Sequence, residues 1–109
     1  MKKIIFFIIL ISIIFSVDNI GWNLENSFAA FSARNDHQVV AYSNKMWLIG
    51  GYNGTRTNDV WNSIDGLNWN LVTSNANFTG RNSHQVVVFS NKMWLIGGNN
   101  GSYKKDVYN

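Results

Sequence analysis

The stretch that decides the fold runs from Arg34 to Gly51, RNDHQVVAYSNKMWLIGG, and returns from Arg81 to Gly98 as RNSHQVVVFSNKMWLIGG. Shifting the sequence by 47 residues aligns residues 22–62 with residues 69–109, and 26 of these 41 positions are identical. A repeat of this period is typical of stacked or radial β units. The sequence therefore predicts two copies of one all-β unit.

Short apolar segments between turn residues predict antiparallel strands in each copy. In the first copy we expect strands at 37–42, 45–50, 59–62 and 68–73, with tight turns at Ser43-Asn44 and Asp65-Gly66. In the second copy we expect strands at 84–89 and 92–97 and a third that begins at residue 106. Residues 20–24 resemble residues 67–71 and predict the last strand of a preceding unit.

Four hairpin-linked strands per unit form a meander, which matches the blade of a β-propeller. The second strands, 46–49 and 93–96, are continuously apolar, as expected for strands covered on both faces. We therefore expect Trp47 and Trp94 to be buried at equivalent places, and likewise Ile49 and Ile96.

Several repeated residues resemble the Kelch-repeat family over residues 22–109: Arg34 and Arg81, the segment Lys45–Gly51 and its twin, Asp59-Val60-Trp61, and Trp69. The resemblance implies antiparallel four-stranded meander blades of a Kelch-type β-propeller. The Kelch-repeat region would span 18–109, with blade one at about 34–73 and a partial blade two at about 81–109. The propeller would thus be incomplete, with about two blades.

The segment Ser63 to Trp69 also resembles the Asp-box hairpin of sialidase-type propellers, with one residue missing between Asp65 and Gly66. The alternative is an ordinary Asp-Gly hairpin turn. Both interpretations give this segment a structural role.

The N-terminal segment predicts export. A short positive start, Met1-Lys2-Lys3, precedes an apolar run from Ile4 to Phe15 that is interrupted only by Ser12. This run fits the apolar core of a signal peptide and is shorter than the roughly 20 residues of a spanning helix. We expect residues 1–17 to form an apolar signal helix and the chain to be secreted, periplasmic or extracellular. The alternative is a membrane anchor formed by an uncleaved leader.

Composition excludes several classes of function. From Val17 onward the chain has seven basic and six acidic residues, so its net charge is near +1. No basic stripe is present to neutralise a phosphate backbone, which argues against nucleic-acid binding. The absence of Cys excludes disulfides, thiolate metal sites and a Cys nucleophile.

The meander places the repeat starts and the loops 52–58 and 99–104 at the same end of the blades. In binding Kelch domains, the Arg that opens the repeat often lines the ligand-facing mouth. The resemblance therefore implies a set of ligand-binding candidates: Arg34, Asn35, Tyr52, Arg56, Arg81 and Asn82. The alternative is that each Arg binds backbone carbonyls or an acidic residue of the next blade.

The other repeated polar residues predict structural roles. His37 and His84 each begin a strand, where an imidazole commonly bonds a neighbouring loop, and further metal ligands are lacking. Asp59 and Asp106 recur in both copies, which favours loop capping or a turn. We therefore expect no metal and no cofactor.

Three functions fit the sequence. The first is a secreted module that binds a protein or carbohydrate. The second is an enzyme of the Kelch class, such as a galactose oxidase, whose Cys-Tyr crosslink this chain cannot form, or a sialate epimerase, which needs a closed propeller mouth. The third is a truncated remnant of a longer propeller without independent activity. We predict a binding module and not an enzyme, with membrane contact only through the leader.

Open blade faces predict self-association. Repeat units stabilise one another mainly through contacts between neighbours, so two incomplete blades should be marginal alone. Exposed apolar faces and unpaired strand edges favour association.

We predict that the leader is removed on export. Mass spectrometry of the exported protein should show a chain that starts close to Val17. Full-length protein retained in the cytoplasm would contradict this prediction.

Overall fold

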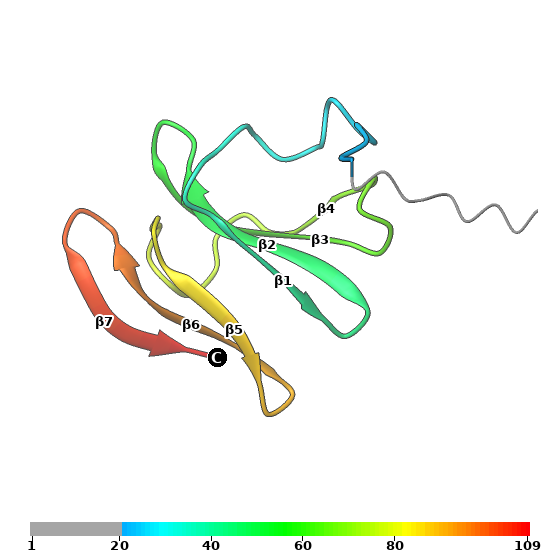
Figure 1. Cartoon of the computed structure of the whole chain (residues 1–109). Coiled ribbons are helices and arrows are strands. Elements are labelled where there is room, and N and C mark those ends of the chain that lie inside the picture. Colours follow the sequence, from blue (N-terminus) through cyan, green and yellow to red (C-terminus); the bar gives the residue numbers. More distant parts are fainter. Residues whose placement is uncertain (1–20) are drawn as a thin grey trace, which may run out of the picture.

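The computed structural model describes residues 21–109, which form seven strands and no helix (Figure 1). The strands are β1 (Gln38–Tyr42), β2 (Lys45–Tyr52), β3 (Arg56–Ser63), β4 (Asn70–Thr73), β5 (Gln85–Phe89), β6 (Lys92–Asn99) and β7 (Tyr103–Tyr108). The predicted signal helix and leader lie outside the described residues. Within 21–109, no helix is available that could cross a membrane.

The strands form two antiparallel meanders. Blade one has the order β1-β2-β3-β4 and blade two has the order β5-β6-β7. The registers are equivalent: Val40 pairs with Trp47 in blade one, and Val87 pairs with Trp94 in blade two. The first strands of the two blades, β1 and β5, lie side by side (Figure 1). The prediction of an all-β chain built from antiparallel meanders is confirmed for the described residues.

The predicted boundaries between the second and third strands of both blades were wrong. The third strands begin at Arg56 and Tyr103, not at residues 59 and 106, because β2 and β6 continue past the Gly pair to Tyr52 and Asn99. The register shift between Ile49 and Gly51 marks a bulge that lets the strand continue. Polar residues near the hairpin tips can pair along their backbones, and this pairing is not visible in an apolar pattern.

The predicted strand at 20–24 is also wrong for the residues that the structure describes, 21–24. Trp22 is fully exposed and Leu24 is 83% exposed, so neither side chain packs on blade one. Among residues 21–109, no strand pairs with this segment.

The turn at Ser43-Asn44 matches the prediction. Both residues have positive φ, 51° and 56°, and the equivalent Ser90 and Asn91 have 49° and 58°. Positive φ at both central residues is the geometry of a type I′ hairpin.

The predicted tight turn at Asp65-Gly66 is instead a longer loop, because β3 ends at Ser63 and β4 begins only at Asn70. The Asp65 carboxylate accepts hydrogen bonds from the backbone N–H groups of Leu67 and Asn68 at 2.9 and 2.8 Å. The buried Ser63 hydroxyl contacts the same carboxylate at 3.0 Å. These bonds hold the pKa of Asp65 well below its usual range. The loop is therefore organised around one carboxylate, whereas a tight turn depends on backbone bonds.

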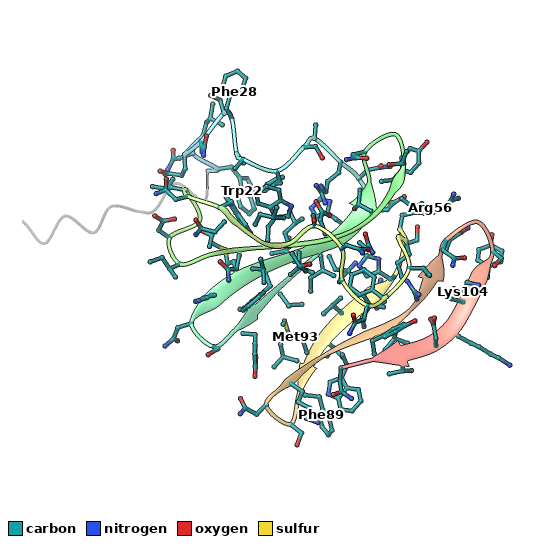
Figure 2. The ribbon with its side chains drawn as sticks, turned by 180° about the vertical axis from the view of Figure 1, so that it is seen from behind. Trp22, Phe28, Arg56, Phe89, Met93 and Lys104 are labelled. Carbon is teal, nitrogen blue, oxygen red and sulfur yellow. The ribbon has the colours of Figure 1, made fainter. Side chains whose placement is uncertain are left out.

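The apolar core lies between the two blades. Ile49 of blade one packs with Phe78, Val86 and Leu95, all less than a tenth exposed. Met93 lies between the two sheets, whereas Phe89 lies toward the far end of blade two (Figure 2). Neither sheet encloses this core alone.

Burial of the second strands is only partly as predicted. Ile49 is 5% exposed, but Ile96 is 44% exposed, so the predicted burial of Ile96 is wrong. Blade two covers Ile49, and no blade of the described chain covers the equivalent face that holds Ile96. Trp47 and Trp94 are both half-buried, and each indole N–H donates to a carbonyl, of Tyr42 and Phe89 respectively.

The segment before each blade covers the blade's preceding face. Phe31 packs edge-on against Trp61 and Trp69, with ring centroids 6.4 and 5.2 Å apart. Phe78 packs edge-on against Tyr108 in blade two at 6.2 Å. The repeat thus includes the connector as well as the strands.

Candidate functional site

Five candidate and neighbouring side chains gather at one end of the blades, where the β2–β3 and β6–β7 hairpins turn. We call this end the rim and define it by Asn35, Tyr52, Arg56, Asn82 and Tyr103. Backbone bonds join Asn35 to Tyr52 in both directions, at 3.0 and 2.9 Å, and Asn82 to Asn99 likewise. The expectation that the repeat starts and these loops share one end is therefore correct.

The rim carries exposed aromatic and cationic side chains. Tyr52 is 41% exposed and Tyr103 is 92% exposed. Arg56 extends from the tip of blade one toward blade two (Figure 2), where its Nε donates to Asn82 Oδ1 at 3.0 Å. This is the one side-chain bond of Arg56 within residues 21–109. The rim thus crosses the junction of the two blades.

Arg34 and Arg81 lie beneath the rim and bind intramolecular acceptors. Both terminal nitrogens of Arg34 donate hydrogen bonds to the carboxylate of Asp59, at 2.7 and 2.8 Å. Its Nη1 also donates to the Gly50 carbonyl at 3.0 Å. Arg81 repeats the arrangement with Asp106, at 2.6 and 3.0 Å, and with the Gly97 carbonyl.

Both Arg side chains are almost completely enclosed, at 2% and 0% exposure. These contacts are of the structural kind left open in the sequence analysis, except that each acid belongs to the same blade as its Arg. Ligand binding by Arg34 and Arg81 stays a prediction, and their observed contacts join β2 to β3 and β6 to β7.

The repeated carboxylates are the partners of these arginines, so the expected role in loop capping was wrong. Burial opposes the charged form of Asp59, but hydrogen bonds from Arg34 and Trp61 outweigh it and hold the pKa below its usual value. The hydrogen bond from Arg81 lowers the pKa of Asp106, and the same contact raises the pKa of Arg81. A spacing of 25 residues between Arg and Asp in both copies is a sequence signal for this pairing.

His84 joins the blades. Its side chain is fully buried, and its Nε2 lies 3.0 Å from the carbonyl oxygen of Ile49 in blade one. Because a carbonyl only accepts, Nε2 carries the proton and donates. A Cβ added at Gly50 would come within 3.0 Å of the His84 ring, so glycine permits this close approach.

His84 is held neutral. Burial lowers its pKa, and the charge of Arg81 adds to this effect, against an opposing contribution from the bond to Ile49. Its buried Nδ1 has no hydrogen-bond partner, and the same is true of Nδ1 in His37. Burial and then the charge of Arg34 lower the pKa of His37, with Asp36 opposing.

No group of three His, Asp or Glu residues close enough to hold a metal occurs within 21–109. His37 and His84 occupy different blades. The His84 imidazole forms an inter-blade contact, which agrees with the structural role expected for a strand-start histidine, whereas the His37 ring forms no hydrogen bond within residues 21–109.

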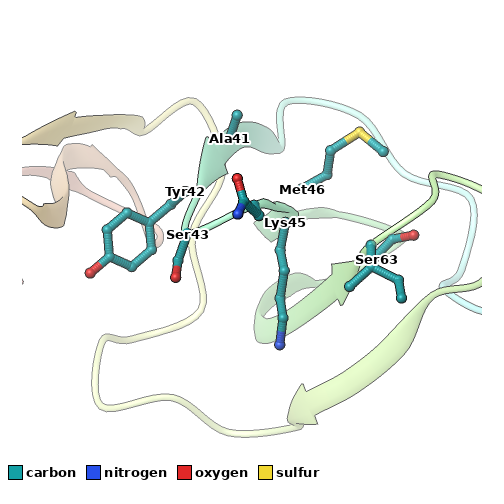
Figure 3. Close-up of a pocket in the computed structure, with 8 residues that line it drawn as sticks. Ala41, Tyr42, Ser43, Lys45, Met46 and Ser63 are labelled. Carbon is teal, nitrogen blue, oxygen red and sulfur yellow. The ribbon is translucent and has the colours of Figure 1, made fainter.

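A hollow lies around the β1–β2 turn, at the end of blade one opposite to the rim. It has a volume of about 390 Å³ and is lined by Ala41–Met46, Ser63 and Ile64. Figure 3 shows that Lys45 and Met46 point in opposite directions and that Tyr42 points away from Ser63. The Tyr42 hydroxyl donates to the carbonyl of Asn91 at 2.8 Å, so this residue joins the blades and is not arranged toward a ligand.

The sequence analysis named Asn35, Tyr52, Arg56 and Asn82, which the structure brings together, and missed Tyr103. Tyr103 aligns with Arg56 under the 47-residue shift and lies in the loop 99–104 that was placed at this end. A comparison of Arg56 with its counterpart could have found it.

Comparison with known families identifies a Kelch motif over residues 33–62. This segment runs from the start of the repeat through most of β3 and includes the Arg34–Asp59 pair. The finding confirms the resemblance inferred from the sequence. Among curated proteins, no relative matches the chain.

We predict that breaking the Arg34–Asp59 pair destabilises the chain strongly. Asp59→Asn leaves a buried guanidinium without its charge partner, which typically costs about 3 kcal/mol or more. Denaturant unfolding followed by Trp fluorescence measures the loss. As a control, Arg34→Met combined with Asp59→Leu should recover part of it, because no unpaired charge remains. A single variant as stable as the parent would contradict the prediction.

We predict that stability falls as the pH drops below about 6.5, the usual pKa of His. The folded-state pKa of His84 is depressed, so its contribution is fully present above the unfolded pKa and is lost as the pH falls through the folded pKa. The free energy of unfolding should therefore be lower at about pH 5 than at about pH 7.5.

His84→Gln is the matched variant, because it keeps a hydrogen-bond donor and removes the titration. It should flatten the pH dependence between these two values, with the remainder assigned to His37. An unchanged pH dependence in His84→Gln would sink the assignment.

Proposed function

Because residues 33–62 match the Kelch motif, we propose that this chain is an exported binding module whose two blades contribute the rim to a protein- or carbohydrate-interaction surface. The observation that carries the proposal is the grouping of Tyr52, Arg56 and Tyr103 at one end, across the junction of both blades. Support for export comes from the leader sequence.

The side chains of the rim suit recognition. Tyr offers a large rigid surface with a polar tip, and Asn offers adaptable donors and acceptors. Arg56 has a planar fork that can donate two parallel hydrogen bonds to a carboxylate. Its single bond to Asn82 uses Nε, which orients the guanidinium at the surface.

Buried ion pairs support the rim. The pairs Arg34–Asp59 and Arg81–Asp106 tie the start of each repeat to the third strand of its blade, from which a hairpin tip extends. A site placed on a rigid scaffold loses less entropy when it binds. We therefore propose that Arg34 and Arg81 act on binding by positioning the rim.

We propose binding and not catalysis. Of the ionisable groups with displaced pKa values, Asp59, Asp106 and His84 are committed to contacts within and between blades, and Asp65 is bound within its own loop. Arg56 donates to the Asn82 amide, whose Nδ2 in turn donates to the Asp36 carboxylate at 3.4 Å, so these polar groups are bound to one another.

The test is binding of the full chain to glycan and peptide arrays, followed by titration of the strongest hits. Tyr52→Ala, Arg56→Ala and Tyr103→Ala should each weaken binding roughly tenfold, as aromatic and Arg anchors do. Lys45→Ala, a cation at the opposite end of blade one, is the control and should bind as the parent does. Equal binding by all variants, or no hit on either array, would count against the proposal.

A further inference from the structure

The two blades meet through two unlike faces. Blade one contributes the face that holds Ile49, Val60 and Val40, which we call the donor face. Blade two contributes the face that holds Val86 and His84, which we call the acceptor face. Both names refer to the faces of the sheets and not to the direction of hydrogen bonds. Ile49 is 5% exposed and Val86 is 8% exposed, so the contact is closely packed.

Blade two leaves its donor face uncovered. The connector of blade one covers only part of that blade's acceptor face, where Phe31 packs on Trp61 and Leu48 is 1% exposed. Ile96 and Val107 of blade two are the counterparts of Ile49 and Val60, yet they are 44% and 55% exposed. With Val87, Phe89 and Trp94, Ile96 lines an apolar hollow. Val39 of blade one is the counterpart of Val86, yet it is 47% exposed.

The polar groups that join the blades are duplicated in the same way. Arg81 N–H donates to the Thr57 carbonyl at 3.0 Å, and Ser83 N–H donates to the Asp36 carbonyl at 3.0 Å. Their counterparts in blade one are the N–H groups of Arg34 and Asp36. Neither has a hydrogen-bond acceptor within residues 21–109.

The histidine contact completes the match. His84 Nε2 donates to the Ile49 carbonyl, whereas neither ring nitrogen of His37 has a side-chain hydrogen bond in the described part of the chain. Its expected acceptor would be the carbonyl of Ile96, which lies on the uncovered donor face of blade two.

We propose that these chains associate head to tail, the acceptor face of blade one in one copy docking on the donor face of blade two in a second copy. The occupant is a second copy because the chain carries both halves of an interface whose closed form is seen between its own blades. Such a contact is heterologous, so it generates a ring if the rotation closes and an open chain if it does not. The inference concerns assembly and does not depend on the ligand of the rim.

One residue differs in a way that tunes the contact. Gly80 lies against the Arg56 carbonyl so closely that an added Cβ would collide with it. Ala33 occupies the equivalent position in blade one. Docking on a second copy therefore requires a local shift at Ala33, and Ala33→Gly should move association to lower concentration.

The experiment blocks one face at a time with a charged substitution in the full chain, and we call such a chain a capped variant. All chains are compared in the same detergent, and their mass is measured by sedimentation velocity. Val39→Lys places a charge on the acceptor face, and Ile96→Lys places one on the donor face. Both positions are nearly half exposed, so the substitutions are compatible with the fold of the free chain. Val72→Lys, at a similarly exposed position on the outer strand β4, is the matched control.

The parent and the Val72→Lys control should gain mass as concentration rises, and each capped variant should remain monomeric. An equimolar mixture of the two capped variants should form a one-to-one dimer, since each supplies the face that the other lacks. Far-ultraviolet circular dichroism equal to that of the parent verifies folding of each variant.

Three results would overturn the proposal: a parent chain that is monomeric at every concentration, a mixture of capped variants that does not pair, or association that persists in the doubly capped chain. The last result assigns association to the leader or to unspecific aggregation. Failure of rim binding leaves these outcomes unchanged, so the two proposals fail separately.

Discussion

The contact between blades is the constraint on which the rest of this structure depends. A three- or four-stranded sheet has two faces and can bury neither alone. Ile49 is buried only because Val86 and Leu95 lie opposite it, and the bond from His84 holds the blades at that spacing. Gly50 permits the approach, because a side chain there would meet the His84 ring and the Arg81 carbonyl.

The Arg–Asp pairs join elements within each blade, whereas this contact joins the two blades. Each guanidinium links the start of a repeat to the third strand, 25 residues later, and to the carbonyl at the Gly pair. Phe78 and Tyr108 stack near Arg81, at 6.0 and 5.3 Å, and extend the apolar enclosure of the charge. A buried ion pair is weak evidence for stability, but it specifies one arrangement, since any shift leaves a buried charge unpaired. The pairs thus define where the hairpin tips of the rim lie.

The repeat predicted the order and pairing of the seven strands β1 to β7, because hairpin turns and apolar runs are local signals, but it also predicted a strand at 20–24 that is absent from residues 21–24. It could not predict which of two identical residues is buried. Ile49 and Ile96 have the same neighbours in sequence, and only the presence of a following blade separates them. The loop around Asp65 was missed for a related reason. Its shape follows from where one carboxylate finds donors, and an Asp-Gly pair alone does not reveal this.

The identical and the variable segments of the two repeats differ in how closely their residues are packed. Residues 55–58 differ from residues 102–105 at all four positions, whereas residues 43–51 are identical to residues 90–98. The identical segment includes the Gly pair and the strand that packs between blades, where a change in volume or backbone freedom is costly. The variable segment forms the hairpin tips, where Thr55, Arg56, Ser102 and Tyr103 are exposed and can change without loss of packing. Arg56 and Tyr103 stand at the same place in this segment, so one scaffold presents a cation on one blade and an aromatic ring on the next. Together with the change from Tyr52 to Asn99, these differences give two similar blades a rim that is chemically different at each tip.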